Sequence, residues 1–267
     1  MEVNCPVTTF ITLDKKTFCR NTVRKLLVAV FWLTIWQLIY MDIKQEILIV
    51  SPVRVLQRLL ELSHDSSFWL SAMNSMVHVL IGFMLGLTVG IVLAVLTSSF
   101  QTMHDLFYPL ISIIKATPVV SFIILALVWL QSPQVPAFTA FLEVTPIVIG
   151  NVTNGIAKAD RNLLQMANSY RFGMVKTVRR VYIPSIMPYF TAACTTGMGL
   201  AWKTSIAAEV LAATKISIGG WIYDSKIYIE TADLFAWTAV VIVMSVILDR
   251  LMVAVMNKVG QKYNVDL

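Results

Sequence analysis

The chain has 267 residues, of which 57% are hydrophobic and only 13% are charged. Roughly a quarter of the residues in a soluble globular domain are charged, so this composition excludes that class and indicates an integral membrane protein. In a membrane protein Lys and Arg mark the loops that lie inside the cell. We therefore attribute the formal net charge of +6 to such loops and expect no nucleic-acid partner.

Cysteine and histidine are too sparse to predict a disulfide framework or a metal site. The cysteines are odd in number, two of them fall in a basic N-terminal tail, and no histidine has a cysteine or carboxylate at metal-ligand spacing. We therefore predict no metal and expect each histidine to be a loop or span-end residue. The residues concerned are Cys5, Cys19, Cys194, His64, His78 and His104.

Six apolar segments approach the ~20 residues that a membrane span requires. Backbone inside a bilayer must satisfy its own hydrogen bonds, and the ~10-residue alternating segments of a barrel are missing, so these spans are expected to be helices. The predicted fold class is an all-α integral membrane protein. Its spans are predicted at residues 26–41, 73–97, 107–130, 137–156, 186–208 and 234–256.

The first span follows a basic tail at residues 1–25 and precedes an amphipathic segment at residues 42–72. In that segment Ser51 and Pro52 are typical of a helix start, and apolar residues recur at helical spacing. We expect it to lie along the outer membrane face. The recurring residues are Val53, Leu56, Leu59 and Leu60.

Three glycines in the second span, Gly82, Gly86 and Gly90, are four residues apart. This spacing leaves one helix face without side chains and lets another helix approach closely. Helix packing is the predicted role, and a gating hinge is the alternative.

Prolines and charges interrupt the third and fourth spans. Pro118 removes a backbone hydrogen bond and predicts a local kink near Lys115 and Thr117, while Glu143 and Pro146 interrupt the next span. Such interruptions line cavities rather than face lipid. Lys115, Thr117, Pro118 and Glu143 are therefore candidates for a translocation path or gate.

A polar, basic island, QMANSYRFGMVKTVRRVYIP, occupies residues 165–184 within the loop at 157–185. It resembles the cytoplasmic EAA loop of ABC-transporter inner-membrane permeases, which reads Glu-Ala-Ala, three residues, Gly, and then Ile-x-Leu-Pro. Ala167 and the ending Ile183-Pro184 fit this pattern. Gln165 and Met166 replace Glu and Ala, Arg171 stands where Gly is usual, and Gly173 comes two residues later.

The resemblance implies that a short helix in this loop docks into a groove on an ATPase subunit. An ordinary basic loop, held inside the cell by its charge, is the alternative. The candidate coupling residues are Gln165, Ala167, Tyr170, Arg171, Gly173, Arg179, Arg180, Ile183 and Pro184.

The fifth span carries a second resemblance, to the nitrate, sulfonate and taurine permease branch. The Ala201-Trp202 and Ala208-Glu209 pairs match that branch in order and spacing, as does the outer segment with Ser51-Pro52 and Phe68-Trp69. Lys203 at mid-helix costs ~2.5–3.5 kcal/mol if it faces lipid, so it is expected to face the bundle interior or a watery path.

Lys203 and Glu209 are six residues apart on different helix faces, so they are not expected to pair with each other. Glu143 or Lys115 are the candidate partners across helices. Trp202, Lys203 and Glu209 thus join the path or gate candidates, and a structural ion pair is the alternative reading.

A loop is predicted at residues 211–232, before the sixth span and a tail at 257–267. Gly219 and Gly220 predict backbone freedom ahead of an aromatic, polar surface. In the resembling family such outer loops meet a substrate-binding protein, whereas an interfacial aromatic belt is the alternative.

Lysine and arginine are distributed unevenly over the predicted loops. Fourteen lie in the N-terminal tail, the loop at 157–185 and the C-terminal end, against five in the remaining loops. Because cytoplasmic loops are rich in Lys and Arg, both termini and the 157–185 loop are predicted to lie in the cytoplasm.

The combined resemblances imply a type I ABC importer permease, with a permease domain over residues 26–256, in the inner or plasma membrane of a prokaryote. The implied solute is a small organic or inorganic anion such as sulfonate, taurine or nitrate, or a vitamin or precursor, carried by alternating access. The chain lacks a G-x-x-x-x-G-K-[ST] loop, so it is not expected to be an enzyme.

The implied partners are a cytoplasmic ABC ATPase dimer, an extracytoplasmic substrate-binding protein and a second permease chain. ATP and Mg are expected on the ATPase, with no cofactor in this chain. Because the ATPase dimer offers two grooves and this chain one loop, a homodimer in membrane lipid is the simplest assembly.

Two other functions are open at this point. An ion-coupled secondary transporter would use Lys115, Glu143, Lys203 and Glu209 as a buried charge relay, but it predicts inverted repeats that the sequence lacks. An intramembrane enzyme is disfavoured, since the chain has no His-Glu-x-x-His site.

Overall fold

The computed structural model describes residues 14–262, and all of the regular structure in that range is helical. The outermost parts of both predicted tails, residues 1–13 and 263–267, lie outside the described residues. Helix α1 already begins at Asp14, within the segment predicted as a tail. The fold is that of an all-α membrane protein, as predicted from composition.

Long helices occupy five of the six predicted spans. They are α1 (Asp14–Ile43), α3 (Ser66–Ser99), α6 (Val135–Ala157), α9 (Ile183–Leu211) and α11 (Thr231–Lys262). Shorter elements join them at their ends: α2 (Pro52–Ser63), a 3₁₀ turn at Ser132–Gln134, α7 (Arg161–Ser169), α8 (Met174–Thr177) and α10 (Ile218–Ile227).

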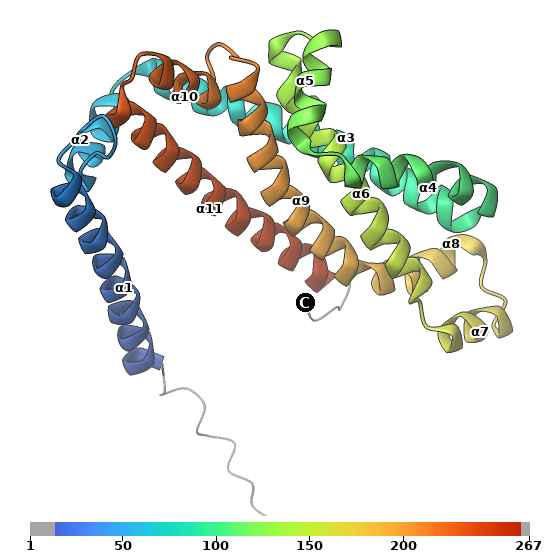
Figure 1. The fold of residues 1–267 in the computed structure, drawn as a ribbon. Helices are drawn as coiled ribbons and strands as arrows, with labels where there is room; N and C mark the ends of the chain where they lie inside the picture. The colour runs from blue at the N-terminus through green and yellow to red at the C-terminus, as the bar shows by residue number, and fades with distance from the viewer. Residues whose placement is uncertain (1–13, 263–267) are drawn as a thin grey trace, which may run out of the picture.

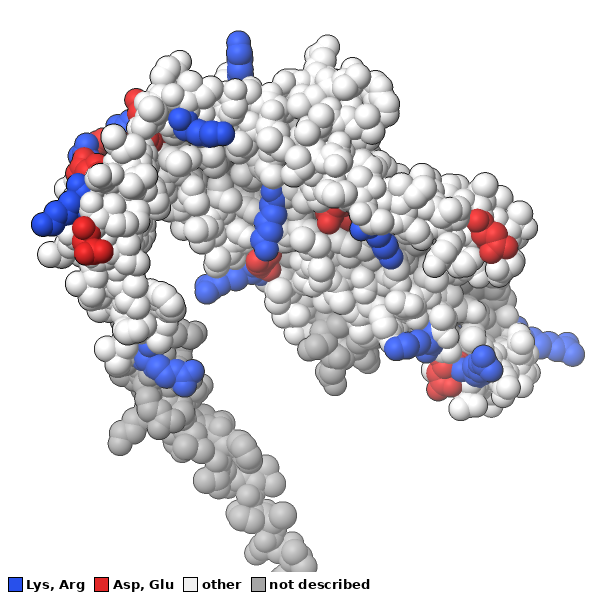
Figure 2. All heavy atoms as spheres, in the orientation of Figure 1, with Lys and Arg blue, Asp and Glu red and all other residues white. Residues whose placement is uncertain are grey.

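The short elements gather at opposite ends of the molecule. Figure 1 shows α2 and α10 at one end, while α7, α8, the start of α1 and the end of α11 lie at the other. Charged side chains gather around α2 and around α7–α8, and further Lys, Arg, Asp and Glu side chains lie on the surface between these two ends (Figure 2).

Three described helices are long and apolar enough to cross a membrane individually: Ser66–Ser99, Ser132–Ala157 and Thr231–Gln261. The pair α4 and α5 would make a fourth span if it is counted as one. Residues Leu27–Ile43 of α1 form a shorter apolar helix. A total of six membrane spans therefore remains a prediction, because it requires α1 and α9 to cross the membrane as well.

The third predicted span is two helices instead of one kinked helix. Helix α4 (Gln101–Ala116) and helix α5 (Val119–Trp129) meet at 106° across the break at Thr117 and Pro118. Thr117 has φ −83° and ψ 130°, which is extended backbone. The ring of a proline disfavours helical geometry in the preceding residue, so two consecutive residues leave the helix here.

The closest helix contact joins α3 to α6 along the three spaced glycines. A Cβ added at Gly86 would lie 2.8 Å from Cβ of Val144, and one added at Gly90 would lie 2.7 Å from Cβ of Val148. Both distances are too short for real Cβ atoms, so only glycine permits this approach. Gly82 faces Ala137 and Ala140 in the same way.

The core is built from α3, α6, α9 and α11. Trp202 of α9 is 1% exposed, and its indole N–H donates to the carbonyl of Val241 in α11 at 3.1 Å. Trp237 of α11 stacks on Trp221 of α10, with ring centroids 6.0 Å apart. Tryptophan therefore contributes buried apolar area in this core, and Trp202 also contributes a satisfied donor.

Helix α2 begins at the predicted Ser51-Pro52 start and is held against α11 by an ion pair. The Ser51 hydroxyl accepts from the backbone N–H of Arg54 at 3.2 Å. Arg58 donates from Nη2 to Oδ2 of Asp233 at 2.9 Å and from Nη1 to Glu61 at 2.8 Å. Asp233, followed by Glu61, raises the pKa of the Arg58 guanidinium, so this ion pair retains its cation at physiological pH.

We predict that Gly90→Ala destabilises the bundle, because its Cβ would overlap Val148 of α6. Overpacking of this kind costs about 1–3 kcal/mol. Thermal unfolding of the purified chain in detergent measures the loss. Gly173→Ala is the control, since its Cβ would meet no atom within 4 Å, and an equal change in both variants would contradict a close α3–α6 contact.

Candidate functional site

The candidate coupling loop forms two short helices that lead directly into α9. Asp160 begins α7, since its carboxylate accepts from the backbone N–H of Asn162 at 2.8 Å. After α7 the chain turns at residues 170–173 and re-enters a helix at Met174. A π-helical turn, Val178–Tyr182, then connects α8 to α9 without a break.

Arg171 adopts the backbone conformation that glycine favours. Its φ is +51°, whereas Gly173 has φ −65°. The backbone N–H of Phe172 donates to the carbonyl of Ala167, and that of Arg171 donates to the carbonyl of Asn168, each at 2.9 Å. This pair of hydrogen bonds is a Schellman motif, in which a left-handed residue ends the helix. Arg171, which stands where the EAA pattern usually has Gly, therefore has the left-handed backbone that glycine favours.

Apolar side chains project from this loop. Met174 is 85% exposed and Val175 is 82% exposed at the start of α8, and Tyr170 is also exposed. Arg179 and Arg180 follow one turn later on the exposed surface, whereas Ala167 is buried. The exposed candidates Gln165, Arg171 and Gly173 belong to the same surface, and Ile183 and Pro184 are half-buried where α9 begins.

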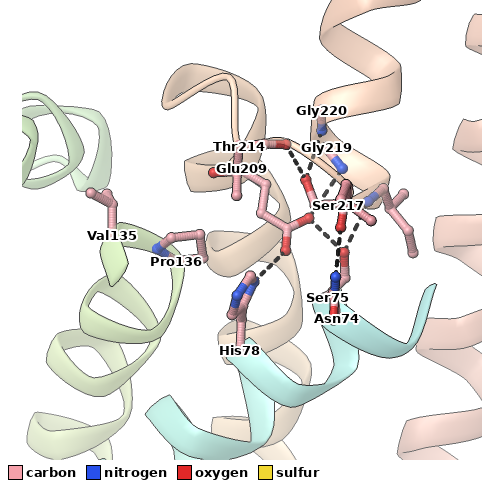
Figure 3. Close-up of polar contacts among 12 residues, drawn as sticks. Asn74, Ser75, His78, Val135, Pro136, Glu209, Thr214, Ser217, Gly219 and Gly220 are labelled. Atoms are coloured by element: carbon pink, nitrogen blue, oxygen red, sulfur yellow. Dashed lines mark hydrogen bonds and ion pairs between the residues drawn. The ribbon is translucent and has the colours of Figure 1, made fainter. Parts of the chain in front are cut away.

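Glu209 is the most buried charged group among the described residues, and α3 supplies its side-chain partners. The Ser75 hydroxyl donates to Oε2 at 2.7 Å, and Nδ1 of His78 lies 3.0 Å from Oε1. The backbone N–H of Gly219, at the start of α10, donates to Oε2 at 3.1 Å. Figure 3 shows these groups, from α3 and α10, converging on the carboxylate that α9 carries.

This Glu209 cluster extends along the loop between α9 and α10. Ser217 ends the loop as the N-cap of α10, because its hydroxyl accepts from the N–H of Gly220 at 2.9 Å and donates to the carbonyl of Thr214 at 2.8 Å. Asn74 donates to the carbonyl of Ile216 at 3.1 Å. The cluster therefore joins α3, α9 and α10 at the end of the molecule that carries α2 and α10.

Three sequence predictions fail in this cluster. His78 is not a loop or span-end residue, because it lies within α3 and contacts a buried carboxylate. Glu209 is partnered by His78 and Ser75 rather than by Glu143 or Lys115. The segment predicted as a loop at 211–232 contains helix α10.

Gly219 and Gly220 provide close approach instead of backbone freedom. Neither has a positive φ. A Cβ at Gly219 would overlap Glu209, and one at Gly220 would overlap the carbonyl of Thr214. The signal that sequence reasoning missed is the polar group Asn74, Ser75 and His78, whose spacing places it near one face of the second span.

The structure separates the other residues of the predicted translocation path into two groups. Trp202 is enclosed between α9 and α11, and Lys203 is exposed on α9 instead of facing the interior of this chain. The ion pairs among the described residues include neither Lys203, Lys115 nor Glu143. The four charges of the proposed relay therefore make no continuous chain of contacts.

Lys115, Thr117, Pro118 and Glu143 do come together. They line a hollow of about 340 Å³ between the α4–α5 break and α6, together with Pro146 and Ile147. Lys115 also borders a second hollow of about 380 Å³ that continues along α4 and α6 to His104 and Asn154. Among the described residues, no cluster of three or more His, Cys, Asp or Glu side chains is suited to a metal.

The profile of one protein family, described as the binding-protein-dependent transport system inner membrane component, matches residues 86–261. A probable ABC transporter permease protein of Brucella melitensis is 25% identical over 218 residues, which are 80% of this chain and 87% of that protein. The nitrate import permease protein of Synechocystis is 26% identical over 211 residues, with 75% and 76% covered.

The taurine transport system permease protein of Escherichia coli is 19% identical over 220 residues, with 80% of each chain covered. Among solved structures, the crystal structure of an amino acid ABC transporter with histidines has a TM-score of 0.61 at 14% identity. The match covers 76% of this chain and 97% of that chain. At this identity the likeness shows the fold.

We predict that Arg171→Gly stabilises the loop, because glycine adopts a positive φ without steric cost. Relief of the left-handed backbone contributes ~1–2 kcal/mol, and the greater freedom of glycine in the unfolded chain offsets ~0.5–1 kcal/mol of it, so thermal unfolding should show a net gain of up to about 1 kcal/mol. Gln165→Gly is the matched control, since Gln165 is exposed in the middle of α7, where glycine should destabilise the helix. A lower melting temperature for Arg171→Gly would contradict the left-handed conformation.

We predict that Glu209→Ala lowers stability by several kcal/mol, since it leaves Ser75 and the Gly219 N–H with no buried acceptor. Melting temperature and the yield of monodisperse protein are the measurements. Glu230→Ala is the control because Glu230 is exposed. Equal effects of the two substitutions would show that the Glu209 cluster contributes nothing to the fold.

Proposed function

We propose a transport mechanism for this chain on the premise that it belongs to the binding-protein-dependent transport system inner membrane component family, in its nitrate, sulfonate and taurine branch. It is an ABC importer permease, a transport subunit of a membrane complex. The proposal adds the contacts with the ATPase, the arrangement of two permease chains, and the class of solute.

The coupling surface on α7 and α8 is proposed to dock on the ATPase. The observation that carries this is the exposure of Met174 and Val175, which are 85% and 82% exposed beside Arg179 and Arg180. Apolar residues this accessible on a polar end of a membrane protein are typical of a partner surface. The preceding turn at Arg171 keeps the pattern of the EAA loop despite its altered sequence.

The ATPase is proposed to hold ATP and Mg, and this chain to hold no cofactor. One coupling surface per chain and two grooves per ATPase dimer favour a homodimer of permease chains. In the proposed cycle, ATP binding closes the ATPases and shifts the permease pair from an inward-open to an outward-open state. A ligand shifts such an equilibrium only through different affinities for the two states.

The proposed orientation places both termini and α7–α8 in the cytoplasm of a prokaryotic cell and places α2 and α10 outside. The excess of Lys and Arg on the first set of segments supports this. The outer end would then meet a substrate-binding protein that delivers the solute. Because the relatives are named for nitrate and taurine, which both contain an anionic group, a small solute that carries an anionic group is proposed here too.

We predict that Arg179→Glu with Arg180→Glu weakens co-purification with the ATPase by about tenfold or more, which corresponds to ~1.4 kcal/mol. Val175→Asp should do the same, since it places an unpaired charge in an apolar contact. The measurement is co-elution of the affinity-tagged permease and its co-expressed ATPase on size exclusion.

Lys215→Glu with Lys226→Glu is the matched control, because both lysines lie near α10 at the opposite end of the molecule. Unchanged co-elution of both coupling-surface variants would overturn the docking proposal. Unaltered melting temperatures of all variants show that the effects belong to the interface.

A further inference from the structure

Two hollows between α4 and α6, here called the α4–α6 track, share the side chain of Lys115. The first is lined by Lys115, Thr117 and Glu143, and the second by Lys115, Gly150 and Thr153. Lys115 borders both hollows, so they meet at its side chain. The track runs from the α4–α5 break toward the end of α6 that precedes the coupling surface.

Helices α4 and α6 supply most of the lining of these hollows. The residues from α6 are Glu143, Pro146, Ile147, Ile149, Gly150, Thr153 and Asn154. Most of them recur three or four residues apart, which is the spacing of one helix face. Helix α6 also contacts α3 and α9 closely.

The ammonium of Lys115 is seated over a position without a side chain. A Cβ added at Gly150 would lie 3.7 Å from Nζ of Lys115. Gly150 follows Glu143 by seven residues, which is about 10 Å along the helix axis. The cation and the carboxylate are therefore at different levels of the same track, and the ion pairs among the described residues do not join them.

Thr153 borders the second hollow, but its hydroxyl oxygen is buried and out of reach of an occupant. The charged groups that the track presents are therefore the ammonium of Lys115 and the carboxylate of Glu143.

We infer that this α4–α6 track is a solute-binding site, and that it takes a small dipolar solute with an anionic group against Lys115 and an ammonium or N–H donor against Glu143. The inference rests on the proposed transport function and narrows its solute class. A simple anion gains attraction from Lys115 but meets repulsion from Glu143 in the same hollow. A solute with both charges gains from each.

Labelling of a cysteine placed between the two charges tests the site. Ile147 lies four residues from Glu143 and three from Gly150, the position over which the Lys115 ammonium lies. A cysteine at this position (Ile147→Cys) therefore reports on both the carboxylate and the ammonium. The chain is first freed of Cys5, Cys19 and Cys194 and is purified as the complex with its ATPase. The probes are two methanethiosulfonate reagents, one carrying a sulfonate and the other a quaternary ammonium.

We expect Lys115→Gln to lower the ratio of sulfonate to ammonium labelling rates by about 3-fold or more, and Glu143→Gln to raise it by a similar factor. Lys226→Gln, on α10, is the control and should leave the ratio unchanged. A reporter that does not react, or a ratio that either substitution leaves unaltered, overturns the site.

Protection of the same cysteine tests the solute class. Taurine carries an ammonium and a sulfonate, and ethanesulfonate is its analogue without the amine. At matched concentrations taurine should slow labelling more than ethanesulfonate, and Glu143→Gln should remove the difference. Equal protection by the two, including none, overturns the dipolar assignment.

These results are separable from the permease proposal. Glu143 and Lys115 lie away from α7 and α8, so their substitution should not alter co-elution with the ATPase. Failure of the labelling test with intact co-elution would reject the binding site alone. Loss of co-elution in the parent complex would reject the proposed coupling instead.

Discussion

The absence of three side chains on α3 determines where the other helices can lie. At Gly82, Gly86 and Gly90 the backbone of α3 approaches α6 more closely than any larger residue would allow. Inside a bilayer, lipid tails are as apolar as the side chains they contact, so close packing has to provide the attraction between helices. Helix α6 also packs extensively on α9. It is consequently the central helix of the bundle, and a glycine, Gly155, again brings it close to its second partner near Tyr189.

This central position explains why the α4–α6 track lies where it does. Helix α6 packs closely on α3 and α9 and also meets α4, which turns away into α5 at Thr117 and Pro118. A straight helix could close over α6 along its whole length, whereas a pair bent by 106° cannot. The space left at the bend is lined by Lys115 and Glu143. Polar residues in this part of the chain therefore border a hollow, which lowers the cost of placing them at membrane depth.

The sequence predicted helix positions and one close contact well, because apolar length and glycine spacing are local properties. The kink predicted at Pro118 is a complete break between α4 and α5, because a proline removes a hydrogen bond and also disfavours helical backbone in the preceding residue, Thr117. The partners of Glu209 were missed for a different reason: His78 lies 131 residues away in the chain, and only the fold brings it near. The resemblance to the EAA pattern indicated the turn at Arg171. Its left-handed backbone was not predictable, because arginine seldom adopts this conformation.

The uninterrupted connection from α8 through the π-helical turn into α9 has a mechanical consequence. Residues from Met174 to Leu211 are helical without a break, but the helix axis changes direction at the π-helical turn between α8 and α9 (Figure 1). The two ends of this segment differ in their contacts. Met174 projects into solvent, whereas Glu209 is hydrogen-bonded to α3 and α10. A helical junction resists independent motion more than an irregular loop does, so α8 and the start of α9 are expected to move as one unit.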